Sequence, residues 1–136
     1  MADSLTTEQQ AGQLFMIGVS TSGLDNATRK AIESGAIGSA VLLGESSAGT
    51  SQIAAITAEL GKLRSAGLPL LVSVDQEGGK VQRLQGKGFS TIPPALRQGA
   101  LEDGQLRTQA QGWGEELVAA GVHYDLAPVA DVVPKG

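Results

Sequence analysis

Two hydrophobic periodicities alternate along the chain. Short, continuous apolar runs are separated by segments in which apolar residues recur every three or four positions. The first pattern is typical of strands buried on both faces, and the second is typical of amphipathic helices. The pattern predicts strands over residues 14–19, 37–43, 68–75 and 122–133, with Pro128 interrupting the last. Because strands and helices alternate, we expect parallel pairing with right-handed crossovers.

Two local signals predict where the first helices begin. Thr6 and Gln9 have the spacing of a capping box, which predicts a short helix that starts at the residue after Thr6. Asp25 is placed to cap a second helix over residues 26–34, which Gly35 can end.

Two later helices are predicted from their apolar stripes. The stripes are Ile53, Ile56, Leu60 and Leu63 within residues 52–65, ending before Gly67, and Leu106, Ala110, Trp113, Leu117 and Ala120, ending at Gly121. Spacing of this kind lines up one face of a helix for burial. Residues 76–103 show neither periodicity, so we expect an irregular segment there.

The predicted elements define an α/β protein with two candidate architectures. One is a small doubly wound sheet, which requires a reversal in strand order. The other is part of a TIM-type (β/α)8 barrel, which needs about 250 residues when complete. Four strands in 136 residues correspond to about half a barrel, so residues 1–136 are expected to form a single partial domain.

Half a barrel has exposed surfaces that must be covered. Parallel strands this apolar need both faces buried, and a half-barrel has two open edges. We therefore expect a partner, either the missing C-terminal half or a second copy of the chain. Alone, a half-barrel should be marginally stable or prone to aggregate.

Composition narrows the functional classes. A net charge of −4 gives no reason to expect nucleic acid or an anionic membrane as partner. The absence of cysteine excludes disulfides and thiolate metal sites, and no other metal or cofactor is predicted. No run approaches the roughly 18 apolar residues of a membrane span, and no signal peptide is visible. The expected location is either the cytoplasm or, for a protein whose signal has been removed, outside it.

One short segment, VSVDQEGGKVQRL, carries candidate chemistry. Asp75 ends a predicted strand, where both candidate folds bind ligands. Gly78 and Gly79 allow a sharp turn or a close approach to a ligand. A carboxylate can accept hydrogen bonds from vicinal hydroxyls, and Arg83 adds a fork of donors, a combination that suits a sugar.

The same residues allow other interpretations. An aspartate after a strand often only caps a turn. Asp75 and Glu77 could be the two acids of a glycosidase, but such acids flank the bond roughly 5 Å or more apart and normally come from separate elements. A phosphate-binding loop is disfavoured because neither of its glycine motifs is present.

The wider sequence resembles the family 3 glycoside hydrolases, in particular their bacterial β-N-acetylhexosaminidase branch. LPLLVSVDQEGGKVQRL is similar to the family signature, QQAGQLFMIGV to its first helix and strand, and IGSAVLL to its second strand. GEELVAAGVHYDLAPVADV is similar to the fourth strand with its preceding helix. The resemblance covers most of the chain in the family's order.

This resemblance implies the first half of a (β/α)8 barrel and retaining cleavage of terminal β-linked N-acetylglucosamine, with water or phosphate as acceptor. The substrate would be a peptidoglycan or chitin-type fragment, as in peptidoglycan recycling. Asp75 would hold sugar hydroxyls in the −1 subsite and Arg83 would assist it. Asp131, at the end of the predicted fourth strand, is a secondary candidate.

The family's catalytic groups have no counterpart in these 136 residues. Neither its nucleophilic aspartate nor its histidine–aspartate acid/base dyad can be matched, so the chain alone is expected to be inactive. His123, at the start of a predicted strand, is expected to be structural, and Trp113 to pack in the core. The alternative is a non-catalytic half-barrel that dimerises as a sugar-binding or scaffold module with two Asp75–Arg83 sites.

Overall fold

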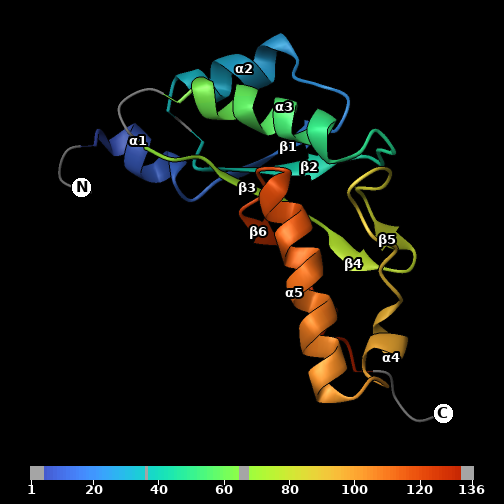
Figure 1. The fold of residues 1–136 in the computed structure, drawn as a ribbon. Helices are drawn as coiled ribbons and strands as arrows, with labels where there is room; N and C mark the ends of the chain where they lie inside the picture. The colour runs from blue at the N-terminus through green and yellow to red at the C-terminus, as the bar shows by residue number, and fades with distance from the viewer. Residues whose placement is uncertain (1–4, 36, 65–67, 133–136) are drawn as a thin grey trace.

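A four-stranded parallel sheet lies at the centre of the molecule (Figure 1). The structure is a computed structural model, and it describes residues 5–35, 37–64 and 68–132. The strands of this sheet are β1 (Met16–Ser20), β2 (Ser39–Leu43), β3 (Leu71–Val74) and β6 (Tyr124–Asp125). Their spatial order, β1-β2-β3-β6, follows the sequence without a reversal. This order fits the wall of a barrel and contradicts the doubly wound alternative.

The predicted helices are present with their expected caps. They are α1 (Thr7–Gly12), α2 (Asn26–Glu33), α3 (Thr50–Lys62) and α5 (Asp103–Ala119). Thr6 and Gln9 form the predicted capping box, with bonds of 3.2 and 3.0 Å. Asp25 accepts from the backbone N–H of Thr28 at 2.7 Å, as expected of the N-cap residue. Gly67, predicted to follow the third helix, lies outside the described residues. No helix in the described ranges has the length and apolarity to cross a membrane.

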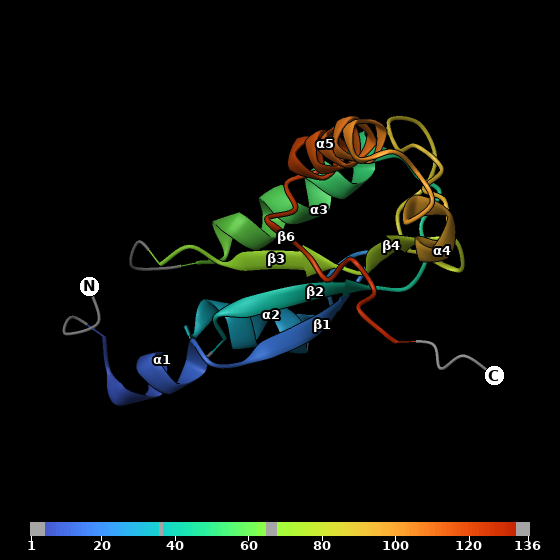
Figure 2. The same ribbon diagram turned by 90° about the horizontal axis from the view of Figure 1, so that it is seen from below.

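The core lies between one face of the sheet and three helices. The parallel register aligns Ile17, Ala40 and Val72 in one row and Val19, Leu42 and Val74 in the next. The apolar faces of α2, α3 and α5 cover these rows. The buried residues there are Ile32, Ile53, Ile56, Leu60 and Leu117, together with Ala120 directly after α5. Helices α2 and α3 lie side by side over the sheet (Figures 1 and 2) and are joined by an ion pair. Arg29 and Glu59 form that pair.

The opposite face of the sheet is largely bare in this chain. The large apolar side chains exposed on its strands are Met16 (41%), Leu43 (46%), Leu71 (41%) and Tyr124 (53%). Ser73 is the exception, because it is fully buried and donates to the Ala40 carbonyl at 3.1 Å. The strands are therefore not buried on both faces, as their apolar pattern predicts for a complete fold.

A single arginine fastens the amino ends of three successive segments. Arg64 donates from Nε to the Leu68 carbonyl at 2.9 Å and from a terminal nitrogen to the Ile37 carbonyl. Its other terminal nitrogen donates to Oε1 of Gln13 at 3.3 Å. These acceptors precede β3, β2 and β1 in the chain. The guanidinium therefore ties together the amino-terminal ends of the three strands, at the edge of the sheet opposite their carboxyl ends.

Two predicted segments differ from the structure. Residues 76–103, predicted to be irregular, contain an antiparallel hairpin, β4 (Gln76–Gly78) with β5 (Val81–Gln82), and a short helix, α4 (Ala95–Gln98), joined by segments without regular structure. The fourth strand is two residues long instead of the predicted 122–133. Leu126 still donates to the Val74 carbonyl at 2.9 Å, but Pro128 has no N–H with which to continue the ladder.

Candidate sugar-binding site

The structure brings Asp75 and Arg83 together at the carboxyl end of β3. Asp75 follows the last residue of that strand, and Arg83 follows β5. Arg83 Nε lies 3.8 Å from Asp75 Oδ2, and both side chains are about 30% exposed (30% and 27%). A separation of 3.8 Å is an ion pair but is too long for a hydrogen bond.

The Arg83 side chain contains an unsatisfied donor. Its Nε is buried and has no hydrogen-bond partner. A buried donor without a partner is unfavourable by roughly 1–3 kcal/mol, and such groups are rare in native structures. Nε therefore lacks an acceptor at the point where the Asp75 carboxylate faces it.

Polar side chains hold the hairpin that carries Arg83. Gln76 accepts from the Leu84 N–H at 3.0 Å and donates to the Leu84 carbonyl at 2.8 Å. Gln82 accepts from the Ile92 N–H at 2.9 Å and donates to the Ser90 carbonyl at 2.8 Å. Because both residues adjacent to Arg83 in the chain are held, its backbone is fixed on either side.

The loop after β2 completes the support of Arg83. The Arg83 carbonyl accepts from the Ser46 N–H at 2.8 Å, and Gln85 N–H donates to the Ser46 carbonyl at 2.8 Å. Sequence reasoning missed the supporting role of Ser46, Gln76 and Gln82. The sequence shows only that glutamines lie within the motif; their burial, which requires hydrogen-bond partners for the amides, is seen only in the structure.

The two glycines of the motif serve chain packing. Gly78 and Gly79 have φ values of +93° and +61°, which confirms the predicted sharp turn. A Cβ on Gly78 would lie 2.5 Å from both Ile92 Cγ2 and the Pro93 carbonyl oxygen, and one on Gly79 would lie 2.8 Å from Pro94 Cβ. The close approach at these glycines is therefore to residues 92–94 rather than to a ligand.

Asp125, which the sequence analysis missed, lies next to this site. Its Oδ1 accepts from the Gln76 N–H at 3.0 Å. Burial raises the pKa of the Asp125 carboxyl, the bond from Gln76 opposes that shift, and the nearby Asp75 and Glu77 carboxylates add to it. Asp131, predicted at the end of the fourth strand, is exposed on the segment beyond it, because β6 already ends at Asp125.

His123 and Trp113, which were both expected to be structural, differ in outcome. His123 accepts from the Val72 N–H through Nδ1 at 3.0 Å and donates its own N–H to the Val72 carbonyl at 2.8 Å. It therefore joins β6 to β3, as a structural residue should. Trp113 lies within α5, is half-buried and is outside the main core cluster, so the expected core position is wrong.

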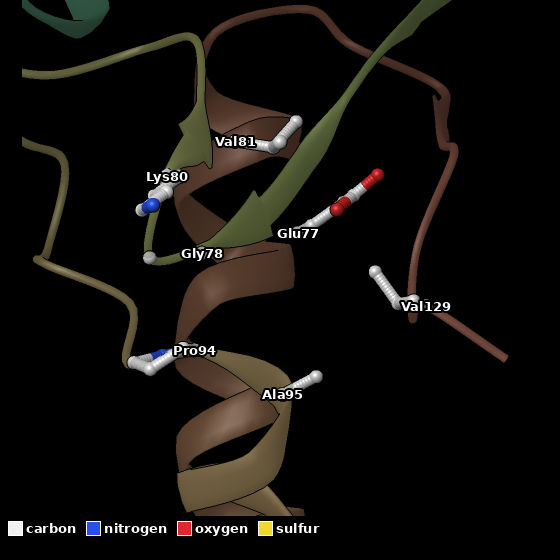
Figure 3. A pocket seen from close by; sticks show the side chains of 8 residues that line it. Glu77, Gly78, Lys80, Val81, Pro94, Ala95 and Val129 are labelled. Carbon is white, nitrogen blue, oxygen red and sulfur yellow. The ribbon is translucent and has the colours of Figure 1, made fainter. Parts of the chain in front are cut away.

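Two pockets lie beside the hairpin, and neither includes Asp75 or Arg83. The first, of about 420 Å³, lies between the hairpin and α4, and the Glu77 and Val129 side chains border it from opposite segments (Figure 3). The second, of about 380 Å³, lies along α5 and is lined by Trp113 and Asp125 among others. No cluster of three or more metal-ligating side chains occurs in the part of the chain that the structure describes.

Parallel β/α units in chain order, with Asp75 and Arg83 paired at the carboxyl end of β3, define part of a barrel-type domain. The family model described as the glycosyl hydrolase family 3 N-terminal domain matches residues 6–135. The chain belongs to this family. The predicted fold class, the first half of a TIM-type barrel, is confirmed by the match to solved structures of the family.

Similar proteins carry hexosaminidase names. The β-N-acetylhexosaminidase of Beutenbergia cavernae superposes with a TM-score of 0.91 and 46% identity, over 95% of this chain and 39% of that protein. A family 3 β-N-acetylglucosaminidase of Paenibacillus gives a TM-score of 0.81 and 35% identity, over 91% and 24%. A β-hexosaminidase of Vibrio cholerae is 35% identical over 106 residues, which are 76% of this chain and 31% of the relative. The chain thus spans well under half the length of these proteins.

The packing of Gly78 leads to a stability prediction. Gly78→Ala should destabilise the protein by at least roughly 1–3 kcal/mol, since a non-glycine residue at φ +93° is strained even before the clash with Ile92. Gly61→Ala is the matched control, because Gly61 lies in α3 with nothing within 4 Å of an added Cβ, and it should stabilise by roughly 0.5–1 kcal/mol. Urea unfolding of the full-length protein measures both; equal midpoints for the two variants would contradict the packing argument.

The raised pKa of Asp125 predicts a pH-dependent stability. In acid the Asp125 carboxyl is protonated in both the folded and the unfolded chain, and the contribution of the protonated group to the free energy of unfolding is then fully present. As pH rises above about 4 and through the raised folded-state pKa, the folded protein must ionise a half-buried carboxyl next to Asp75 and Glu77, and stability is lost. Asp125→Asn lacks this loss, so its free energy of unfolding should rise relative to the original protein over that window. A difference that stays constant or falls with pH, measured by chemical unfolding at a series of pH values, would refute it.

Proposed function

We propose that this chain is the N-terminal part of a retaining glycoside hydrolase that acts on terminal β-linked N-acetylglucosamine. Asp75 and Arg83 would supply part of the sugar-binding site. The observation that carries the proposal is the partly exposed ion pair of Asp75 and Arg83, in which Nε lies 3.8 Å from Oδ2 at the carboxyl end of β3. The names of the similar proteins from Beutenbergia and Paenibacillus support the choice of sugar.

The geometry suits a hydroxyl group. A hydroxyl group placed beside the ion pair can accept from a terminal nitrogen of the Arg83 guanidinium and donate its proton to the Asp75 carboxylate, since both side chains are partly exposed. Each of these bonds involves an ionised partner, so each is stronger than a neutral hydrogen bond. A ring with vicinal hydroxyls would thus use donors of the guanidinium and acceptor sites of the carboxylate together.

Bond cleavage would depend on groups that this chain does not supply. In a retaining mechanism, a carboxylate nucleophile forms a glycosyl-enzyme intermediate, and an acid/base group first protonates the leaving oxygen and then activates the acceptor. In this proposal residues 1–136 form one partial domain that grips the sugar, Asp131 is at most an accessory to the loop after β6, and the reacting groups come from elsewhere in the protein.

The bare face of the sheet points to the partner. We propose that the remainder of the barrel covers the exposed face carrying Met16, Leu43, Leu71 and Tyr124. The chain covers only 39% of the Beutenbergia protein, so enough chain exists in such relatives to do this. The glycan itself, a peptidoglycan or chitin-type fragment with terminal N-acetylglucosamine, is the other proposed partner.

Hydrolysis of an aryl N-acetyl-β-glucosaminide by the full-length protein tests the site. Asp75→Ala should lower kcat/KM by roughly 10- to 100-fold, because one hydrogen bond to a charged group contributes about 1.5–3 kcal/mol. Arg83→Lys should also lower it, since the lysine keeps the charge but loses the planar donor fork. Lys80→Ala, an exposed cation on the same hairpin, is the control and should have little effect. Unchanged kcat/KM in Asp75→Ala, or turnover by residues 1–136 alone, would contradict the proposal.

The second candidate is a dimeric, non-catalytic half-barrel. The exposed apolar face supports this candidate as well, because a second copy of the chain could cover it in place of the rest of the barrel. Size-exclusion chromatography of residues 1–136 distinguishes the two. If the rest of the barrel is the natural cover, the isolated chain should aggregate or melt without cooperativity. A discrete dimer with cooperative melting would favour the second candidate, and a dilute monomer that melts cooperatively would contradict both expectations.

A further inference from the structure

Asp125 reaches from β6 to the peptide that follows Asp75. We infer that Asp125 is a positioning residue that fixes the orientation of the Asp75 carboxylate toward Arg83 and the sugar. The inference rests on the proposed function in so far as Asp75 is taken to hold the sugar. What it adds is the assignment of a second acid, on a different strand, that acts through Asp75 without touching the substrate.

The β6 ladder is short, and side chains extend it at both ends. Only two residue pairs join β3 to β6, Ser73 with Tyr124 and Val74 with Asp125. At the amino end the His123 side chain accepts from the Val72 N–H at 3.0 Å. At the carboxyl end the Asp125 side chain accepts from the Gln76 N–H at 3.0 Å. The second extension lies directly beside the candidate site.

These contacts hold both peptide groups that flank Asp75. The carbonyl of the Val74–Asp75 peptide accepts from the Leu126 N–H at 2.9 Å. The N–H of the Asp75–Gln76 peptide donates to Asp125 Oδ1. Because the direction of a Cα–Cβ bond follows from the two flanking peptide planes, the pair of bonds sets where the Asp75 side chain begins. Loss of the Asp125 bond frees the second plane.

The same bond leads on to Arg83. Gln76, whose N–H binds Asp125, also pairs through its side chain with the backbone of Leu84, the residue after Arg83. One residue therefore links Asp125 to both members of the site. A small rotation of Gln76 would shift Asp75 and Arg83 together, and displacements of about 1 Å can lower rates by roughly 100-fold.

Position and charge make different predictions for substitutions at Asp125. Asparagine keeps an oxygen acceptor at the same distance and removes the charge beside Asp75 and Glu77. Glutamate keeps the charge but moves the acceptor outward by one methylene group. If the position of the acceptor matters, Asp125→Asn should retain activity and Asp125→Glu should lose it. If the charge matters, Asp125→Glu should retain activity and Asp125→Asn should lose it.

The kinetic test uses the full-length protein and an aryl N-acetyl-β-glucosaminide. We expect Asp125→Ala and Asp125→Glu to lower kcat/KM at least roughly ten-fold, and Asp125→Asn to stay within about three-fold of the original protein. Asp103→Ala, an exposed aspartate at the start of α5, is the matched control. In an Asp75→Ala background, Asp125→Ala should cause a smaller loss than it does in the original protein, because only its effect on Arg83 remains, whereas an independent structural role would add its full effect. An additive loss, or a glutamate variant as active as the original, would overturn the inference.

Amide hydrogen exchange at Gln76 separates this inference from the proposed function. The Gln76 N–H should exchange faster in Asp125→Ala and Asp125→Glu than in the original protein, and remain protected in Asp125→Asn. If the original protein shows no turnover but the exchange follows this order, the proposed function fails while the positioning role of Asp125 stands. Unchanged exchange at Gln76 in the glutamate variant, which retains the charge and a carboxylate, would refute the positioning role whatever the activity.

Discussion

Packing of three helices against one face of a parallel sheet is the constraint on which the other features depend. The rows Ile17–Ala40–Val72 and Val19–Leu42–Val74 must face α2, α3 and α5 together, and this requirement sets the register of the strands. Parallel pairing in a fixed register then brings the carboxyl ends of the strands to one edge. The loop after β2, the acid after β3 and Asp125 of β6 meet there for that reason.

The same constraint leaves the other face of the sheet without a cover. Because the strand order has no reversal, right-handed crossovers place all the helices on the same face of the sheet. The side chains that alternate with the core rows therefore point away from the helices. In a closed barrel these side chains fill the interior. The bare face and the short share of the relatives' length therefore have one explanation, an incomplete barrel wall.

The site edge uses polar contacts where the core uses apolar ones. Gln76 and Gln82 bind backbone groups of the hairpin with their side-chain amides. The carboxylate of Asp125 and the imidazole of His123 accept from backbone N–H groups at the two ends of the β6 ladder. Such bonds are directional, so they fix backbone planes that hydrophobic packing alone would leave free to shift. A site that grips hydroxyl groups needs this precision, and the buried Arg83 Nε is the one donor that the described structure leaves unmatched in it.

The sequence by itself determined the order and type of the main elements, the capped starts of α1 and α2, and the placement of Asp75 at a strand end. These follow from periodicity, cap chemistry and chain order, which are local properties. Only the tertiary structure decided that residues 76–98 form a hairpin and a helix, that Gly78 accommodates Ile92, and that Asp125 rather than Asp131 ends the last strand. Those outcomes depend on bonds between residues distant in the sequence, such as that from Gln76 N–H to Asp125, and such bonds leave no periodic signal.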